Sequence, residues 1–258
     1  MRFISHAYTD IGIKKNVNQD SALVMEAKTD NENIMFCVLC DGMGGLDSGE
    51  LASAVVIKAF ASWFEEKFPI MYYNRFDSKM LEKVWADLLF EQNIKLMTYS
   101  RSKSLTMGTT VVTLLICSGK YYVMNVGDSR AYIHNGSLNQ ITVDQTFVNR
   151  EIRLGNMTPE QAENDPRSNV LLQCVGASQF IEPDFFEGDV KGEDVFILCS
   201  DGFRHVVKAN EIEEAFSPEK IETEFDIEKN EEKLVELNKE RLERDNITVI
   251  CVKSFDNR

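Results

Sequence analysis

The stretch VLCDGMGGLDSGE, residues 38–50, joins an apolar run to a helical pattern through a turn with few side chains. The apolar run 34–40 stops at Asp41. Three of the next four residues are glycine: Gly42, Gly44 and Gly45. Glycine has no Cβ, so it lets the backbone come close to a ligand. An Asp-Gly pair at a strand end is also typical of an ordinary turn. Other motifs in the sequence are needed to distinguish a turn from a binding site.

Six further segments are rich in Val, Ile, Tyr and Phe, a composition that favours strands. They are residues 21–25, 110–117, 121–126, 131–134, 195–199 and 247–252. The pairs Ser118-Gly119 and Asn135-Gly136 follow two of these segments and predict tight hairpin turns. We therefore expect much of the sheet structure to be antiparallel.

Apolar residues at helical spacing predict two long helices between the second and third strands. The first presents an apolar face made of Leu51, Ala52, Val55, Val56, Ala59, Phe60 and Trp63. Asp47 and Ser48 are both candidates for its N-cap. The second runs from about residue 77 to 99, with Leu81, Trp85 and Leu88 facing inward.

Two further helices are expected in the second half of the chain. Thr158-Pro159-Glu160-Gln161 has the residues of a capping box, with proline in the first turn. A last helix covers roughly residues 228–244, with a thin stripe of Leu234, Leu237 and Leu242. Because strands and helices interleave without a linker, we expect a single domain over residues 1–258.

Composition and charge argue for a globular protein and against membrane, secreted and nucleic-acid-binding proteins. Apolar residues make up 43% of 258 residues, enough for a substantial core. We expect no membrane span and no secretion, because the chain has no run of eighteen apolar residues and no basic, apolar leader. The net charge is −14, and residues 211–245 hold 14 acidic and 6 basic side chains. This charge argues against a nucleic-acid partner.

The six cysteines are expected to be reduced and buried, which suits the cytoplasm. Cys37 and Cys40 have the C-x-x-C spacing of some metal and redox sites. On a strand, however, positions i and i+3 point to opposite faces. The pair therefore cannot share a metal ion, and a structural role is expected.

Five aspartates lie at the margins of the predicted strands, most of them beside glycine or asparagine. They are Asp20, Asp41, Asp128, Asp201 and Asp245. Carboxylates that converge repel one another, and a divalent cation removes that cost. Oxygen ligands without His or Cys suit a hard ion such as magnesium or manganese. Each aspartate alone could be a turn former, but the set predicts a metal site.

The order of these motifs resembles one family, the metal-dependent Ser/Thr protein phosphatases of type 2C. The similar segments are Thr9-Asp10-x-Gly12 with Asn18-Gln19-Asp20, Asp41-Gly42-Met43-Gly44-Gly45 with Gly49-Glu50-x-Ala52-Ser53, Gly108-Thr109-Thr110, Val126–Tyr132, Ser200-Asp201-Gly202 and Asp245-Asn246-Ile247-Thr248. They span residues 8–252. The Asp-Gly-Met-Gly-Gly form and the compact length look like the bacterial members.

The resemblance implies an α+β fold, a four-layer αββα sandwich of two antiparallel sheets flanked by helices. It also implies two tightly bound cations, Mn²⁺ or Mg²⁺, at one end of the sandwich. Asp41 would bridge them, the Gly42 carbonyl would hold one, and Asp201 and Asp245 would hold the other. Asp128 would hold a third, weaker ion together with Asp201. Asp20 would orient water, and residues 149–175 would form a flap beside the cleft.

The implied reaction is attack of a metal-activated water on phosphorus, in line with the leaving group. It needs no Ser, Cys or His nucleophile. The chain has only three histidines, His6, His134 and His205, and each is expected at the surface or in a structural role.

Three positions depart from the family pattern. Lys15 stands five residues before Asp20, where the family usually has an arginine that grips the substrate phosphate. We expect Lys15 to contact phosphate instead, although a solvated surface lysine beside Lys14 is the alternative. Gln19 stands where many members have Glu, and Met43 where many eukaryotic members have His, a proposed general acid. For Asp128, a turn paired with Arg130 is the alternative to metal binding.

The sequence therefore predicts a cytoplasmic, monomeric phosphatase that acts on phosphoserine and phosphothreonine in proteins. Its partners would be phosphorylated proteins and a cognate Ser/Thr kinase, with no nucleic acid and no membrane. A catalytically silent relative that acts as a binding module is the first alternative, and the complete set of aspartates argues against it. A hydrolase of small phosphate esters is the second.

Overall fold

The structure is a computed structural model that describes residues 1–44, 48–74 and 76–256. Gly45 and Asp47, the second a candidate cap of the first long helix, lie outside these residues. Ser48 occupies the N-cap position of that helix, but its hydroxyl makes no capping bond to the described part of the helix. The five strand-margin aspartates and Lys15 are all described.

Two five-stranded sheets form the centre of the molecule, and all neighbouring strands in them are antiparallel. The first contains, in spatial order, β1 (Arg2–Asp10), β12 (Ile247–Phe255), β11 (Val195–Cys199), β8 (Arg130–His134) and β9 (Leu138–Gln140). The second contains β10 (Asp184–Asp189), β7 (Lys120–Val126), β6 (Val111–Cys117), β3 (Asn33–Cys40) and β2 (Ser21–Lys28). A short ribbon pairs β4 (Gly42–Gly44) with β5 (Met107–Thr109).

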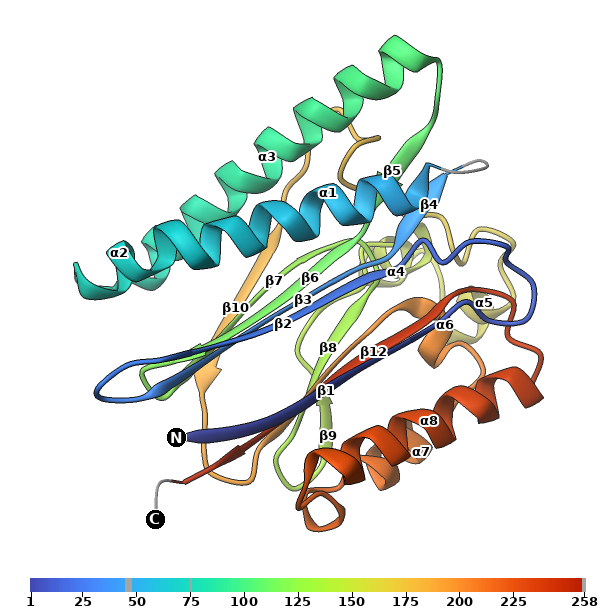
Figure 1. Cartoon of the computed structure of the whole chain (residues 1–258). Coiled ribbons are helices and arrows are strands. Elements are labelled where there is room, and N and C mark those ends of the chain that lie inside the picture. The colour runs from blue at the N-terminus through green and yellow to red at the C-terminus, as the bar shows by residue number, and fades with distance from the viewer. Residues whose placement is uncertain (45–47, 75, 257–258) are drawn as a thin grey trace.

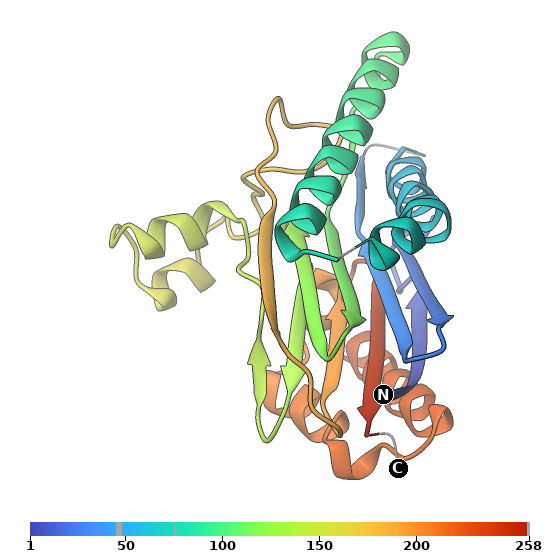
Figure 2. The same ribbon diagram turned by 90° about the vertical axis from the view of Figure 1, so that its left-hand side faces the viewer.

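Helices cover the outer face of each sheet, which confirms the four-layer α+β prediction (Figures 1 and 2). Over the second sheet lie α1 (Gly49–Ser62), a π-helical turn η1 (Trp63–Lys67), α2 (Phe68–Tyr73) and α3 (Ser78–Lys103). Over the first lie α6 (Asp201–Arg204), α7 (Ala209–Ala215), the 3₁₀ turn η2 (Pro218–Lys220) and α8 (Glu224–Glu240). A segment with α4 (Phe147–Arg153) and α5 (Pro159–Glu163) projects sideways from the sandwich in Figure 2.

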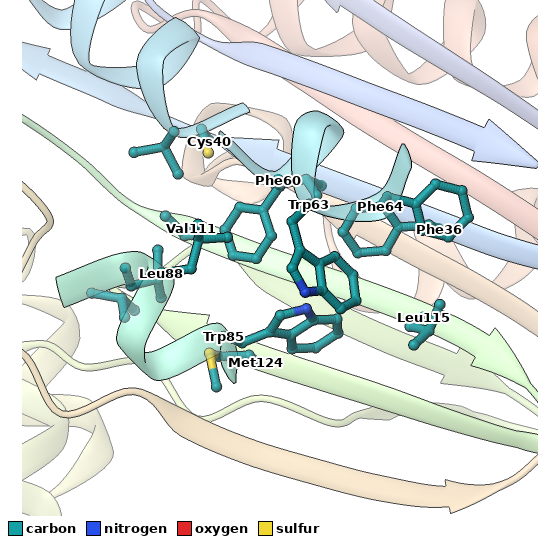
Figure 3. Packing of buried hydrophobic residues seen from close by; sticks show 14 of the residues in the cluster. Phe36, Cys40, Phe60, Trp63, Phe64, Trp85, Leu88, Val111, Leu115 and Met124 are labelled. Atoms are coloured by element: carbon teal, nitrogen blue, oxygen red, sulfur yellow. The ribbon is translucent and has the colours of Figure 1, made fainter. Parts of the chain in front are cut away.

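Alternation along β3 divides its side chains between two apolar layers. Phe36 and Cys40 pack under the helices, where Phe36 contacts Trp63 and Trp85 with ring centroids 5.5 and 6.0 Å apart (Figure 3). Cys37 instead faces the other sheet. The prediction that Cys37 and Cys40 point to opposite faces is therefore confirmed. All six cysteines are buried free thiols.

The predicted turns and caps are largely confirmed. Ser118 and Gly119 both have positive φ, 53° and 72°, as a tight two-residue hairpin requires. Thr158 forms the expected capping box with Gln161. Two apolar predictions are wrong, because Leu51 is exposed on α1 and Leu242 lies beyond the end of α8 with 70% of its surface exposed. No helix in the described ranges is long and apolar enough to cross a membrane.

Candidate active site

The two sheets bring the five aspartates to the same end of the sandwich. β2 and β3 pair so that Ser21 lies opposite Cys40, which places Asp20 and Asp41 next to each other. In the other sheet, Cys199 of β11 pairs with Val249 of β12. Asp201 follows β11 and Asp245 precedes β12, so both lie at the matching edge. Asp128 follows β7 in the turn to β8.

The electrostatics of this end show that the carboxylates influence one another. Burial and four neighbouring carboxylates raise the pKa of Asp41 well above its ordinary value. The four are Asp20, Asp201, Asp128 and Asp245. Burial also raises the pKa of Asp20 to about 7, against the opposing effect of the Thr248 and Ser200 hydroxyls. Burial and Asp201 raise the pKa of Asp128 to about 7. A positive charge at this place would stabilise the ionised forms.

Gly42 lies where three backbone segments cross. A Cβ on this residue would lie 2.3 Å from the carbonyl oxygen of Gly49 and 2.4 Å from that of Gln19. Only glycine fits without a backbone shift. Threonine residues hold the preceding residue in place: the Thr109 hydroxyl and the Thr110 amide both donate to the Asp41 carbonyl. Close packing of the backbone therefore explains why residue 42 is a glycine, in addition to any need for a ligand to come close to its backbone.

Lys15 lies at the site, where it contacts a carboxylate, and its contact with a substrate phosphate stays a prediction. Its Nζ lies 2.6 Å from Asp245 Oδ1, and each side chain is 39% exposed. Burial lowers the pKa of Lys15, but the hydrogen bond and charge of Asp245 and the charges of Asp41 and Asp201 outweigh it, so the pKa is raised. Lys14 is exposed to solvent.

Asp128 lies in a turn, as its alternative role required, but the predicted pairing of Asp128 with Arg130 is wrong. Arg130 instead makes a two-pronged contact with Asp144, from Nε at 2.8 Å and Nη2 at 2.6 Å. Asp128 faces a different guanidinium, that of Arg204, whose Nη2 lies 3.6 Å from its Oδ2. Asp128 is buried, with 7% of its surface exposed.

The sequence reasoning missed His205 and Glu243. Nε2 of His205 lies 3.8 Å from Asp201 Oδ2, and Nδ1 lies 3.5 Å from Glu243 Oε2. Glu243 Oε1 accepts hydrogen bonds from the backbone amides of Arg244 and Asp245. Hydrogen bonding to Glu243 is the main cause that raises the pKa of His205. One imidazole therefore connects the segments that carry Asp201 and Asp245.

A signal for His205 exists in the sequence, whereas none exists for Glu243. His205 follows Asp201 by four residues, the spacing that places two side chains on one helix face. Glu243 reaches the site through a chain reversal beyond α8, which no local spacing reveals. The other two histidines lie elsewhere: His6 contacts Glu231 of α8, and His134 is buried at the end of β8.

The donor atoms fit a hard divalent cation. Asp20 Oδ2 is buried and has no hydrogen-bond partner among the described residues. The convergent groups are carboxylate and backbone oxygens, the ligands that magnesium and manganese prefer. In the described ranges no three His, Cys, Asp or Glu side chains already form a complete coordinating group.

Comparison with known proteins defines the class. Residues 12–242 match the family model described as protein phosphatase 2C. Serine/threonine phosphatase stp of Listeria monocytogenes serotype 4b is 32% identical over 209 residues, which cover 80% of this chain and 80% of that protein. Protein phosphatase PhpP of Streptococcus pneumoniae is 28% identical over 95% of this chain and 94% of that protein.

Solved structures agree with this assignment. Serine/threonine phosphatase Stp1 from Staphylococcus aureus superposes with a TM-score of 0.84 at 30% identity, covering 100% of this chain and 96% of that one. The catalytic domain of the serine/threonine protein phosphatase PstP, in complex with two manganese ions, gives 0.78 at 27% identity, covering 98% and 99%. The chain belongs to the protein phosphatase 2C family. The predicted enzyme class, a protein serine/threonine phosphatase, is confirmed.

Proposed function

We propose that this enzyme hydrolyses phosphoserine and phosphothreonine in proteins with the help of divalent cations, Mn²⁺ or Mg²⁺. One observation carries the proposal: aspartates from both sheets converge at one end of the sandwich and raise the pKa of Asp41 together. The two manganese ions in PstP support it. Two ions would be held by Asp41, the Gly42 carbonyl, Asp201 and Asp245. A third, weaker ion would be held by Asp128 with Asp201.

When bound, such cations supply an activated water and neutralise charge on the phosphoryl oxygens. The protein's own groups do the rest. Asp20 Oδ2, which is free of protein partners among the described residues, accepts a hydrogen bond from the attacking water and orients it. Lys15, on the exposed side of the site, leaves Asp245 and contacts the substrate phosphate. His205 and Glu243 keep the Asp201 and Asp245 segments in register.

The proposed partners are phosphorylated proteins, among them a cognate Ser/Thr kinase and its targets. The serine/threonine names of the relatives support this substrate class. We place the enzyme in the cytoplasm as a monomer with one catalytic domain over residues 1–258. Six buried cysteines, all free thiols, support a reducing compartment.

The test is phosphate release from a phosphothreonine peptide, with manganese and with EDTA. We expect turnover with manganese, none in EDTA, and for Asp41→Asn with manganese a rate lower by about three orders of magnitude or more. Free phosphothreonine and p-nitrophenyl phosphate serve as comparison substrates. Faster turnover of these small esters than of the peptide would favour the small-ester hydrolase. No phosphate release from any substrate, by protein that binds manganese, would favour the silent binding module.

A further inference from the structure

Arg204 lies between the candidate site and the base of the segment that carries α4 and α5. Its Nη2 donates a hydrogen bond to the Asp128 carbonyl oxygen at 2.8 Å. The same nitrogen lies 3.6 Å from Asp128 Oδ2 and 3.4 Å from Asp144 Oδ2. The side chain is 12% exposed, and its Nε is buried without a hydrogen-bond partner in the described part of the chain. Arg204 therefore has fewer partners than its five donors can use.

Asp144 does not need Arg204 to balance its charge. Arg130 already grips both Asp144 oxygens, at 2.8 and 2.6 Å. Gln140 Nε2 donates to Asp144 Oδ1 as well, at 3.1 Å. Asp128 has no such two-pronged partner among the described residues. Arg204 is therefore shared between the two carboxylates, at 3.4 Å from Asp144 and 3.6 Å from Asp128, and Asp128 is the one that has no other guanidinium partner among the described residues.

The position of Arg204 is fixed by the same helix that presents Asp201. Both residues belong to α6, one helical turn apart. An arginine keeps its charge at every pH that a protein tolerates. A permanent positive charge is therefore held at a set place beside the candidate site.

We propose that Arg204 is an internal counter-cation of Asp128, which competes with a divalent cation for that carboxylate and keeps the cation bound there weak. The inference rests on the proposed function, because it assumes that Asp128 holds a cation. Two positive charges near one carboxylate repel, and burial strengthens that repulsion. Asp144 then sets the strength of the competition, because it draws the guanidinium away from Asp128.

The experiment counts bound manganese by the loss of the free Mn²⁺ signal in electron paramagnetic resonance, which does not depend on turnover. Arg204→Gln removes the charge and keeps an N–H donor for the Asp128 carbonyl. We expect the dissociation constant of the weakest ion to fall about tenfold, with the tighter ions unchanged. Arg204→Met, which removes charge and donor together, should give the same result.

Two controls separate this effect from the general charge of the protein. Arg2→Met also removes one positive charge, but Arg2 pairs with Phe255 at the end of the sheet opposite the aspartates. It should leave every manganese constant unchanged. Asp144→Asn should act with the opposite sign, because Arg204 then turns fully to Asp128, and the weakest ion should bind several-fold more weakly. In the Arg204→Gln/Asp144→Asn double variant, the effect of Asp144→Asn should disappear.

The outcomes distinguish this inference from the proposed function. If Asp128→Asn abolishes the weakest ion but both Arg204 variants bind it as the natural chain does, the counter-cation role is wrong and the metal site stands. If Asp128→Asn leaves all manganese binding intact, no cation is held there, and both proposals fail at Asp128. Thermal unfolding in EDTA identifies the variants that fold.

Discussion

Nζ of Lys15 lies 2.6 Å from Oδ1 of Asp245, so an ammonium group from the β1–β2 loop contacts a carboxylate at the start of β12. Both side chains are 39% exposed, and an exposed ion pair of this kind contributes at most about 1 kcal/mol. Lysine can therefore exchange Asp245 for another anion at little cost. Lys15 is therefore placed where it could contact a substrate phosphate.

Replacement of Lys15 should change substrate binding more than catalysis. A lysine is a point charge, whereas arginine grips phosphate with two parallel hydrogen bonds. Lys15→Arg should lower KM for a phosphopeptide several-fold, by about 1 kcal/mol of charge-assisted hydrogen bonding. Lys15→Ala should raise KM more than it lowers kcat. Lys14→Ala is the control, and steady-state kinetics is the measurement. Equal and unchanged KM values for Lys14→Ala and Lys15→Ala would rule out the phosphate contact.

Conversion of a proposed metal ligand to its amide should separate activity from folding. Asp41→Asn should lower the phosphatase rate by about three orders of magnitude or more, because a metal ligand is lost. Its melting temperature in EDTA should equal or exceed that of the natural chain, because one repelling charge is gone. Asp201→Asn and Asp245→Asn should behave alike. Asp189→Asn, at the exposed end of β10, is the matched control and should keep full activity. Near-normal turnover of Asp41→Asn would exclude it as a ligand.

The metal-free protein should lose stability as the pH rises. Burial raises the pKa of Asp20 to about 7, above its value near 4 in the unfolded chain. The folded state then binds the proton more tightly, so this contribution to stability is complete below about pH 4 and is lost as the pH rises to about 7. Melting temperatures in EDTA should fall over this range, and Asp20→Asn should show a smaller fall. Parallel curves for the two proteins would show that Asp20 does not titrate in this way.

Glu243 should support the metal site from outside it. Glu243→Gln weakens the acceptor of the Arg244 and Asp245 amides and the partner of His205. We expect a loss of roughly 1–2 kcal/mol in stability and a tenfold or greater loss of manganese affinity. Calorimetric titration with manganese measures the second effect. Glu240→Gln, on an exposed position of α8, is the control. A stability loss with unchanged manganese affinity would limit Glu243 to a structural role.

The strands that the sequence predicted are those with long apolar runs. β3, β11 and β12 are buried on both faces between helices and the opposite sheet, so their composition alone reveals them. β1 was missed because it is an edge strand of mixed character, with polar side chains such as His6 among apolar ones. β10 was missed because four of the six residues in its sequence, DFFEGD, are acidic or glycine. Pairing with neighbours, not composition, makes these segments strands.

The aspartates of the site could be predicted because each one lies next to the end of a strand, which is a local feature of the sequence. The residues that contact these aspartates could not be predicted in this way. Arg204 contacts Asp144, which lies 60 residues earlier in the sequence. Arg130 pairs with Asp144 and not with Asp128, and this depends on the geometry of a turn. The resemblance to type 2C phosphatases supplied the roles of the aspartates. It supplied nothing for His205 and Glu243.

The apolar layer between the two sheets acts as the spacer of the active site. Asp20 and Asp41 belong to one sheet, and Asp201 and Asp245 to the other, so the gap between the two pairs depends on what fills the layer between them. Leu39, Leu198 and Ile250 lie in that layer, close along the chain to the site residues. Close-packed interiors transmit a change of a single methylene. We therefore expect that a conservative core substitution can leave the melting temperature unchanged and still alter the distance between the two pairs of aspartates. The preference for one cation over another would then depend partly on hydrophobic residues that do not contact the ion.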